Sequence, residues 1–164
     1  MTKKVMYFTE EIIEKIFEQE IESDNDPVME LENIAADQPA LISYLGQENL
    51  ELLTEEEFDY CAFLVTIIYK TYAQSGLEMA MIEPDQIDAA EELNWEKINA
   101  SEGKKFKQRI DSLFEGFSQE DLLAFVEDAL EADDLPIVTN EGREPMFIIL
   151  KTIIDVLEES VKVR

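Results

Sequence analysis

The segment from Thr54 to Gly76 constrains the fold of this chain most, because it predicts a long helix that is apolar nearly all the way round. Thr54 and Glu57 have the spacing of a capping box, in which two side chains satisfy backbone N–H groups at a helix start. Apolar residues then cover almost every face between Tyr60 and Tyr69. A helix of this kind is buried by other elements. We therefore expect it at the centre of a bundle.

Capping residues and prolines divide the rest of the chain into further amphipathic helices. The predicted starts are Thr9, Asp26 with Pro27, Asp37 with Pro39, Pro84, the residues after Gly103, Ser118 and Pro145. Residues 77–83 alternate between apolar and polar, but a lone strand has no partner, so we expect an ordered connection. At 164 residues the chain is long enough for one substantial core. The prediction is a single all-α domain over residues 1–164, a bundle of seven or eight helices around the central apolar helix.

Two nine-residue segments resemble each other in this sequence. Asp37–Leu45 (DQPALISYL) and Ser118–Val126 (SQEDLLAFV) share a cap, a Gln, two aliphatic residues, a small residue, an aromatic and an aliphatic in the same order. Each segment leads into one of the two most apolar helices. Any two capped amphipathic helices can show such a likeness, so two hypotheses stay open: chance, and a bundle made of two related helical hairpins.

The charge of the chain restricts its partners. Between Ile16 and Glu96 there are 21 Asp and Glu residues and one cation, Lys70, and the net charge is −26. Such a field repels nucleic acid and anionic membranes and attracts basic protein surfaces or cations. The longest apolar run has ten residues, too few to span a bilayer. The single cysteine, Cys61, lies in that run and is expected to be a buried thiol, which fits a reducing cytoplasm. We expect a cytoplasmic protein that binds neither nucleic acid nor membrane.

Several kinds of catalytic chemistry are excluded by the residues the chain lacks. There is no histidine, which removes Ser-His and Cys-His nucleophilic mechanisms and the imidazole ligands of most zinc sites. The five glycines are scattered singly, so no glycine-rich phosphate loop is present. We therefore expect no cofactor and no catalytic residue.

Carboxylate-only metal chemistry passes these exclusions and is kept as an alternative. Glu48 with Glu51, and Glu56 with Asp59, have the paired spacing that places Mg²⁺ ligands on neighbouring helices in the all-α nucleotide pyrophosphohydrolases. Only four residues separate the two pairs, and a chain with 39 acidic residues contains such spacings by chance. The main interpretation therefore assigns no metal site.

The acidic residues best suited to contact a partner are those that local structure does not explain. Glu131, Asp133 and Asp134 lie at the predicted C-terminal end of a helix, where the helix dipole disfavours negative charge. Glu55 to Glu57, in contrast, lie in a first turn, where the dipole favours them. Trp95, the one tryptophan, is expected on the flank of its helix, as core-edge packing or as an interface anchor.

Together these features predict a non-enzymatic, acidic, all-α interaction protein that docks on a basic protein surface. Inhibitors and immunity-type proteins of basic nucleases, and mimics of the nucleic-acid backbone, use surfaces of this kind. Two alternatives remain: a Mg²⁺-dependent all-α hydrolase such as a nucleotide pyrophosphohydrolase, and a structural homodimer.

Overall fold

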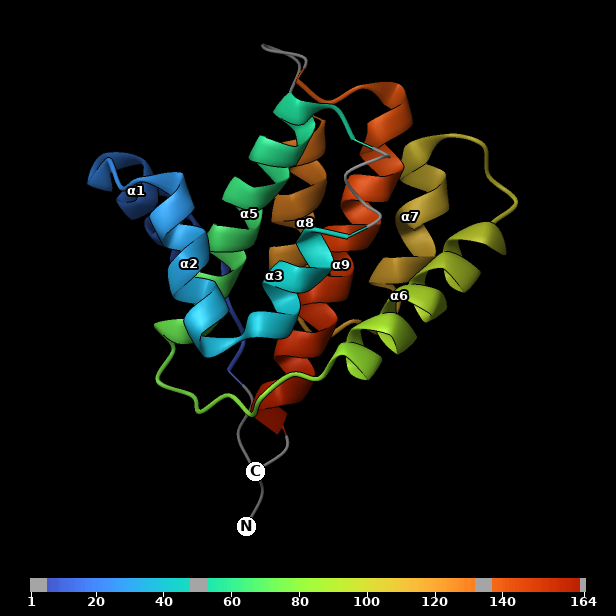
Figure 1. Cartoon of the computed structure of the whole chain (residues 1–164). Coiled ribbons are helices and arrows are strands. Elements are labelled where there is room, and N and C mark those ends of the chain that lie inside the picture. Colours follow the sequence, from blue (N-terminus) through green and yellow to red (C-terminus); the bar gives the residue numbers. More distant parts are fainter. Residues whose placement is uncertain (1–5, 48–52, 132–136, 163–164) are drawn as a thin grey trace.

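A computed structural model describes residues 6–47, 53–131 and 137–162 of the chain (Figure 1). Within these ranges the regular structure is entirely helical, and the predicted all-α bundle is confirmed. The helices are α1 (Glu10–Ser23), α2 (Pro27–Asp37), α3 (Pro39–Leu45), α5 (Glu55–Ala73), α6 (Pro84–Asn99), α7 (Phe106–Phe114), α8 (Glu120–Leu130) and α9 (Asn140–Lys162). None of these described helices combines the length and the apolarity needed to cross a membrane.

Two helices, α5 and α9, form the centre of the bundle. Figure 1 shows them with α3 and α8 in the middle of the molecule, with α1 and α2 on one side and α6 and α7 on the other. The middle of α5 is buried, as its apolar sequence predicts, and α9 is buried along most of its length from Met146 to Val161. The sequence pattern identified the first of these central helices, and the second shares its role.

The helix starts depend partly on local caps and partly on distant residues. The capping box is confirmed: the Thr54 N–H donates to Glu57 Oε1 at 2.9 Å, and the Glu57 N–H donates to Thr54 Oγ1 at 3.1 Å. The prediction that Pro145 opens the last helix is wrong, because α9 begins at Asn140. Thr139 caps it by accepting from the Gly142 N–H at 3.0 Å, and Glu57 holds Thr139 in place from α5.

The predicted N-caps at Asp37 and Ser118 are wrong by one residue. In both segments the following glutamine, Gln38 or Gln119, occupies the N-cap position and is buried. Each side chain binds the backbone of an extended segment in the same way. Gln38 donates to the Ala80 carbonyl at 3.0 Å and accepts from the Ile82 N–H at 2.9 Å. Gln119 donates to the Met6 carbonyl at 2.7 Å and accepts from the Phe8 N–H at 3.0 Å.

These matching contacts relate two halves of the described chain. In each half an extended segment precedes four helices, α1, α2, α3 and α5 in the first and α6, α7, α8 and α9 in the second. The glutamine at the start of the third helix binds the extended segment of the other half. The fourth helices both follow a threonine cap, Thr54 or Thr139. The likeness seen in nine residues of sequence therefore extends to the arrangement of both halves, and favours the repeat over chance.

Candidate functional site

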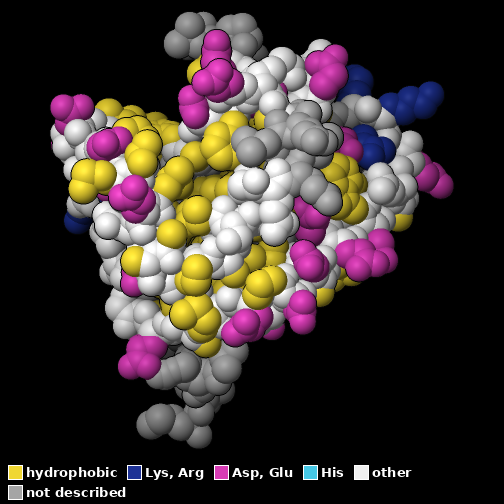
Figure 2. Space-filling model, viewed as in Figure 1, with side chains coloured by type: hydrophobic (Ala, Val, Ile, Leu, Met, Phe, Trp, Pro, Cys, Tyr) yellow, Lys and Arg dark blue, Asp and Glu magenta, His cyan; other side chains and the backbone are white. Residues whose placement is uncertain are grey.

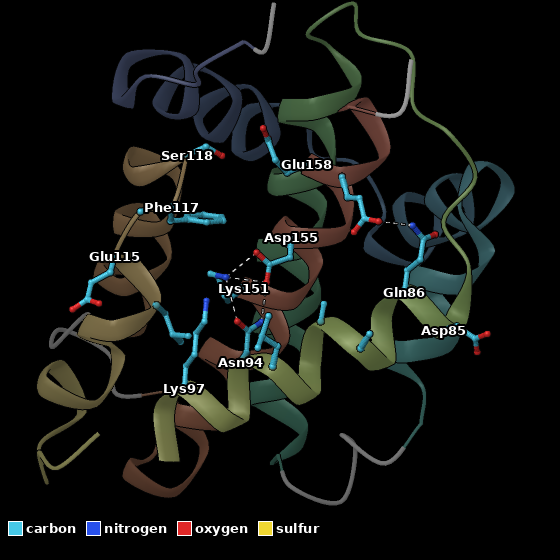
Figure 3. Close-up of a pocket in the computed structure, with 16 residues that line it drawn as sticks. Asp85, Gln86, Asn94, Lys97, Glu115, Phe117, Ser118, Lys151, Asp155 and Glu158 are labelled. Carbon is cyan, nitrogen blue, oxygen red and sulfur yellow. Dashed lines mark hydrogen bonds and ion pairs between the residues drawn. The ribbon is translucent and has the colours of Figure 1, made fainter. Parts of the chain in front are cut away.

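A cavity of about 740 Å³, which we call the α6–α9 cavity, lies between α6, the turn joining α7 to α8, and α9 (Figure 3). It combines buried polar side chains with an acidic mouth. The polar residues that line it are Asp85, Gln86, Asn94 and Lys97 from α6, Glu115 and Ser118 from the turn, and Lys151, Asp155, Glu158 and Glu159 from α9. Gly116, in this turn, has a positive φ of 68°, a conformation that glycine adopts without strain.

Lys151 is the buried cation of the α6–α9 cavity, with 4% of its surface exposed. Its ammonium group donates to both carboxylate oxygens of Asp155, at 2.7 and 2.9 Å, and to the Asn94 Oδ1 at 3.2 Å. The ammonium also lies 4.4 Å from the centre of the Phe117 ring, in cation–π contact. Figure 3 shows these groups converging from α6, α9 and the turn.

The surroundings of Lys151 indicate a structural ion pair. Burial lowers the pKa of Lys151, while the carboxylate of Asp155 acts against that shift. A lysine with a lowered pKa can serve as a nucleophile or a base, but only if its nitrogen is free to react. Here the three N–H donors have acceptors in Asp155 and Asn94. Asn94 also donates to Asp155 at 2.9 Å, so the network fastens α6 to α9.

Glu158 belongs to a second buried network, at the end of the α6–α9 cavity next to Ser118 (Figure 3). Its Oε1 accepts from the Tyr72 hydroxyl at 2.7 Å and from the Gln119 Nε2 at 3.1 Å. Its Oε2 is buried and has no hydrogen-bond partner among the described residues. A buried carboxylate oxygen without a donor is unfavourable, and a donor supplied by a ligand would relieve it.

The mouth of the α6–α9 cavity is acidic. Asp85, Glu115 and Glu159 are exposed there, and Lys97 is the exposed cation among the lining residues. The deeper lysine, Lys151, is already neutralised by Asp155. The cavity is therefore suited electrostatically to a cationic group, such as an ammonium or a guanidinium, more than to an anion.

The predicted partner-binding residues lie outside the α6–α9 cavity. Glu131 is the C-cap residue of α8. The pKa of Glu127 is raised mainly by the burial of Glu127 and next by the negative charge of Glu131. Asp133 and Asp134 lie outside the described residues. Trp95 is half-buried on α6 and packs against the core. A role in partner contact stays a prediction for all four residues.

The structure describes two of the four residues of the alternative metal site. Glu56 and Asp59 are exposed in the first turns of α5. Glu48 and Glu51 lie outside the described residues, so the distance between the two pairs stays open. Elsewhere, in the part of the chain that the structure describes, no group of three acidic or cysteine side chains is placed to hold a metal ion.

Weak signals of the α6–α9 cavity are present in the sequence. Lys151 and Asp155 are four residues apart within the mostly apolar stretch 146–157 of α9. This spacing predicts an ion pair, which would explain why two charges are tolerated there. Asn94 and Glu158 carry no such signal, because their partners lie on other helices.

Comparison with models of protein families, with curated proteins and with solved structures found no match for this chain.

Proposed function

We propose that this protein is a non-enzymatic acidic interaction protein that docks on a basic protein surface. The observation that carries the proposal is how charge is distributed in the structure. Exposed carboxylates lie along α1, α2 and α6, whereas three of the cations form ion pairs within the molecule. Lys70 pairs with Glu20 and Glu30, Arg109 with Glu144, and Lys151 with Asp155.

Three further basic side chains are gathered at one place. Lys104, Lys105 and Lys107 are exposed at the start of α7. Figure 2 shows dark blue side chains mainly at one edge of the visible face, with Asp and Glu around much of the remaining margin and hydrophobic side chains over the middle. A surface with one sign of charge over several helices steers a partner of the opposite sign and speeds its association. This segregation supports docking on a basic protein.

The test is capture of partners from a native lysate at two salt concentrations, about 0.05 M and about 1 M, because the Debye length falls to about 3 Å at the higher one. We expect a discrete basic protein to be retained at low salt and released at high salt. A protein captured equally at both would contradict docking by charge.

The two alternatives predict different results. A hydrolase that uses Glu48, Glu51, Glu56 and Asp59 would be stabilised by millimolar Mg²⁺, and Glu48→Gln with Glu56→Gln would remove the rise in melting temperature. Such a specific shift would overturn the non-enzymatic proposal. A structural homodimer would sediment as a dimer without capturing a basic protein, whatever the salt concentration.

A further inference from the structure

A second hollow, the α1–α8 groove, runs between helices α1 and α8 and has a volume of about 350 Å³. Its floor is apolar and consists of Ile13, Phe17, Ala124 and Phe125. Its rims are acidic, with Glu10 and Glu14 on α1 and Asp121 and Asp128 on α8. Lys15, the cation of α1, instead lines a different hollow beside Thr71 and Gln74. All the charged side chains that line the groove are therefore negative.

The floor of the α1–α8 groove is held in shape before any partner binds. The Phe17 ring meets the Phe125 ring edge-on with 6.0 Å between centres, and the Phe63 ring in the same way at 5.9 Å. Both Phe17 and Phe125 are only partly buried. An apolar side chain that covers them would gain burial without first rearranging the floor.

One end of the groove is also fixed. The Asp121 carboxylate accepts from the Glu10 N–H at 3.0 Å, and the Asp121 N–H donates to the Tyr7 hydroxyl oxygen at 3.0 Å. These bonds tie the start of α1 to the start of α8. The spacing of the two acidic rims therefore does not depend on a ligand.

The other half of the molecule shows that the fold does not require this surface. When the halves are aligned on Gln38 and Gln119 and on the segments these residues bind, Phe125 corresponds to Tyr44 and Phe17 to Glu91. Tyr44 is buried, and its hydroxyl donates to the carboxylate of Glu91. In the other half, the two positions equivalent to Phe125 and Phe17 therefore hold a hydrogen-bonded polar pair in place of two phenylalanines. The partly buried phenylalanines between acidic rims need a separate explanation.

We infer that the α1–α8 groove docks a basic amphipathic helix of the partner. An apolar side chain of that helix packs on Phe17 and Phe125, and its flanking Lys or Arg side chains pair with the acidic rims. This is helix-in-groove recognition, with the apolar anchor giving affinity and the charges giving register and speed of association. The inference rests on the proposed function, because it names the kind of segment by which a basic partner would bind.

The first experiment measures binding of a synthetic peptide of about 14 residues, with Leu at helical i, i+3 and i+4 spacing and Lys elsewhere. A scrambled peptide of the same composition is the comparison. We expect the amphipathic peptide to bind roughly tenfold more tightly, because only it presents a continuous apolar stripe. Ala124→Gln fills the groove without changing net charge and should remove that advantage.

The matched control is Ser43→Gln, at the position that corresponds to Ala124 in the other half, and it should bind like the wild type. Circular dichroism and the melting temperature check that both variants fold. A charge pair gives a second measurement that leaves the floor intact: Glu14→Gln with Asp128→Asn, against Glu32→Gln with Asp88→Asn. All four residues are exposed. Only the first pair should weaken binding and reduce its dependence on salt.

The outcomes separate the inference from the proposed function. Equal binding of both peptides, or wild-type affinity in Ala124→Gln and in the Glu14 and Asp128 pair, overturns the groove as the docking site. Salt-sensitive binding in that case still supports an acidic docking protein. If neither basic peptide binds at low salt, the proposed function fails together with the inference.

Discussion

Glu57 is a single residue that connects the starts of both central helices. Its Oε1 accepts from the Thr54 N–H, and its Oε2 accepts from the Thr139 N–H at 2.8 Å and from the Thr139 hydroxyl at 2.9 Å. Glu57 is almost completely buried. Burial alone would raise the pKa of Glu57, but the hydrogen bonds from Thr54 and Thr139 outweigh it and lower the pKa.

Gly142 makes this arrangement possible. A Cβ atom at residue 142 would lie 2.0 Å from Glu57 Oε2, so the carboxylate would have to leave its donors. We predict that Gly142→Ala destabilises the protein by about 2 kcal/mol, through overpacking and loss of buried hydrogen bonds. Urea unfolding measures the change. Gly46→Ala is the control, since its Cβ would meet nothing closer than 3.6 Å, and a loss of stability as large as that of Gly142→Ala would contradict the explanation.

At the scale of helices, the sequence predicted what local chemistry determines. The capping box of Thr54 and Glu57 and the cap at Thr9 depend on neighbours three residues away, and both are present in the structure. The start of α9 was predicted too late, at Pro145, although Thr139 caps it locally by accepting from the Gly142 N–H; the bonds that hold Thr139 in place come from Glu57, 82 residues distant. A threonine marks a possible helix start locally, but the distant hydrogen bonds that select it over Pro145 have no local sequence signal.

The glutamines make the same point about the candidate sites. Gln38 and Gln119 matched in the sequence comparison, but only the structure shows that each binds an extended segment of the other half. The α1–α8 groove was likewise invisible, because Phe17 and Phe125 are far apart in the chain and each fits an amphipathic helix pattern. Sequence periodicity identifies the apolar residues, and the packing of helices decides which of them stay exposed.

The attachment of α6 to α9 can be tested through Lys151 and Asp155. We predict that Lys151→Met costs about 3 kcal/mol, because it leaves a partly buried carboxylate without its cation. Asp155→Asn should also lower the free energy of unfolding, because it leaves the buried ammonium of Lys151 without its carboxylate. The double variant should cost less than the sum of the two, by at least about 0.5 kcal/mol, as expected for groups in direct contact.

A longer ion pair with one exposed partner provides the control for this cycle. Lys107 lies 3.9 Å from Glu127, and 74% of its side chain is exposed. The coupling between Lys107→Met and Glu127→Gln should be no more than a few tenths of a kcal/mol, since the two groups are 3.9 Å apart and solvent screens the Lys107 ammonium. Urea unfolding of both sets gives the comparison. Additive effects at Lys151 and Asp155 would show that the buried pair does not act as a unit.

For the molecule as a whole, the negative charge that we propose attracts a basic partner also works against folding. At a net charge of −26 the compact state repels itself, and the core must outweigh this repulsion. Added salt should therefore raise the melting temperature in the absence of any partner. Over the same range of salt concentration, binding of a basic partner should weaken. Salt should therefore stabilise the free protein and destabilise its complex.

The dependence of stability on pH should show two opposite trends. Burial, followed by the charge of Glu131, raises the pKa of Glu127. The folded form then binds a proton more readily than the unfolded form, so the free energy of unfolding increases as the pH falls from 7 to about 5.5. Glu57 has a lowered pKa, and its stabilisation is lost only as the pH falls below its ordinary value of 4.5.

We therefore predict that the melting temperature, measured at constant ionic strength, rises from pH 7 to about 5.5 and falls again in stronger acid. Glu127→Gln should reduce the rise, because the residue can no longer take up a proton. Glu57→Gln should lower stability at neutral pH and reduce the loss in acid. A melting temperature that falls steadily from pH 7 downwards would mean that favourable carboxylate contacts such as those of Glu57 outweigh the repulsion among the exposed acids. It would also contradict a crowded, mutually repelling acidic surface of the kind proposed to attract a basic partner.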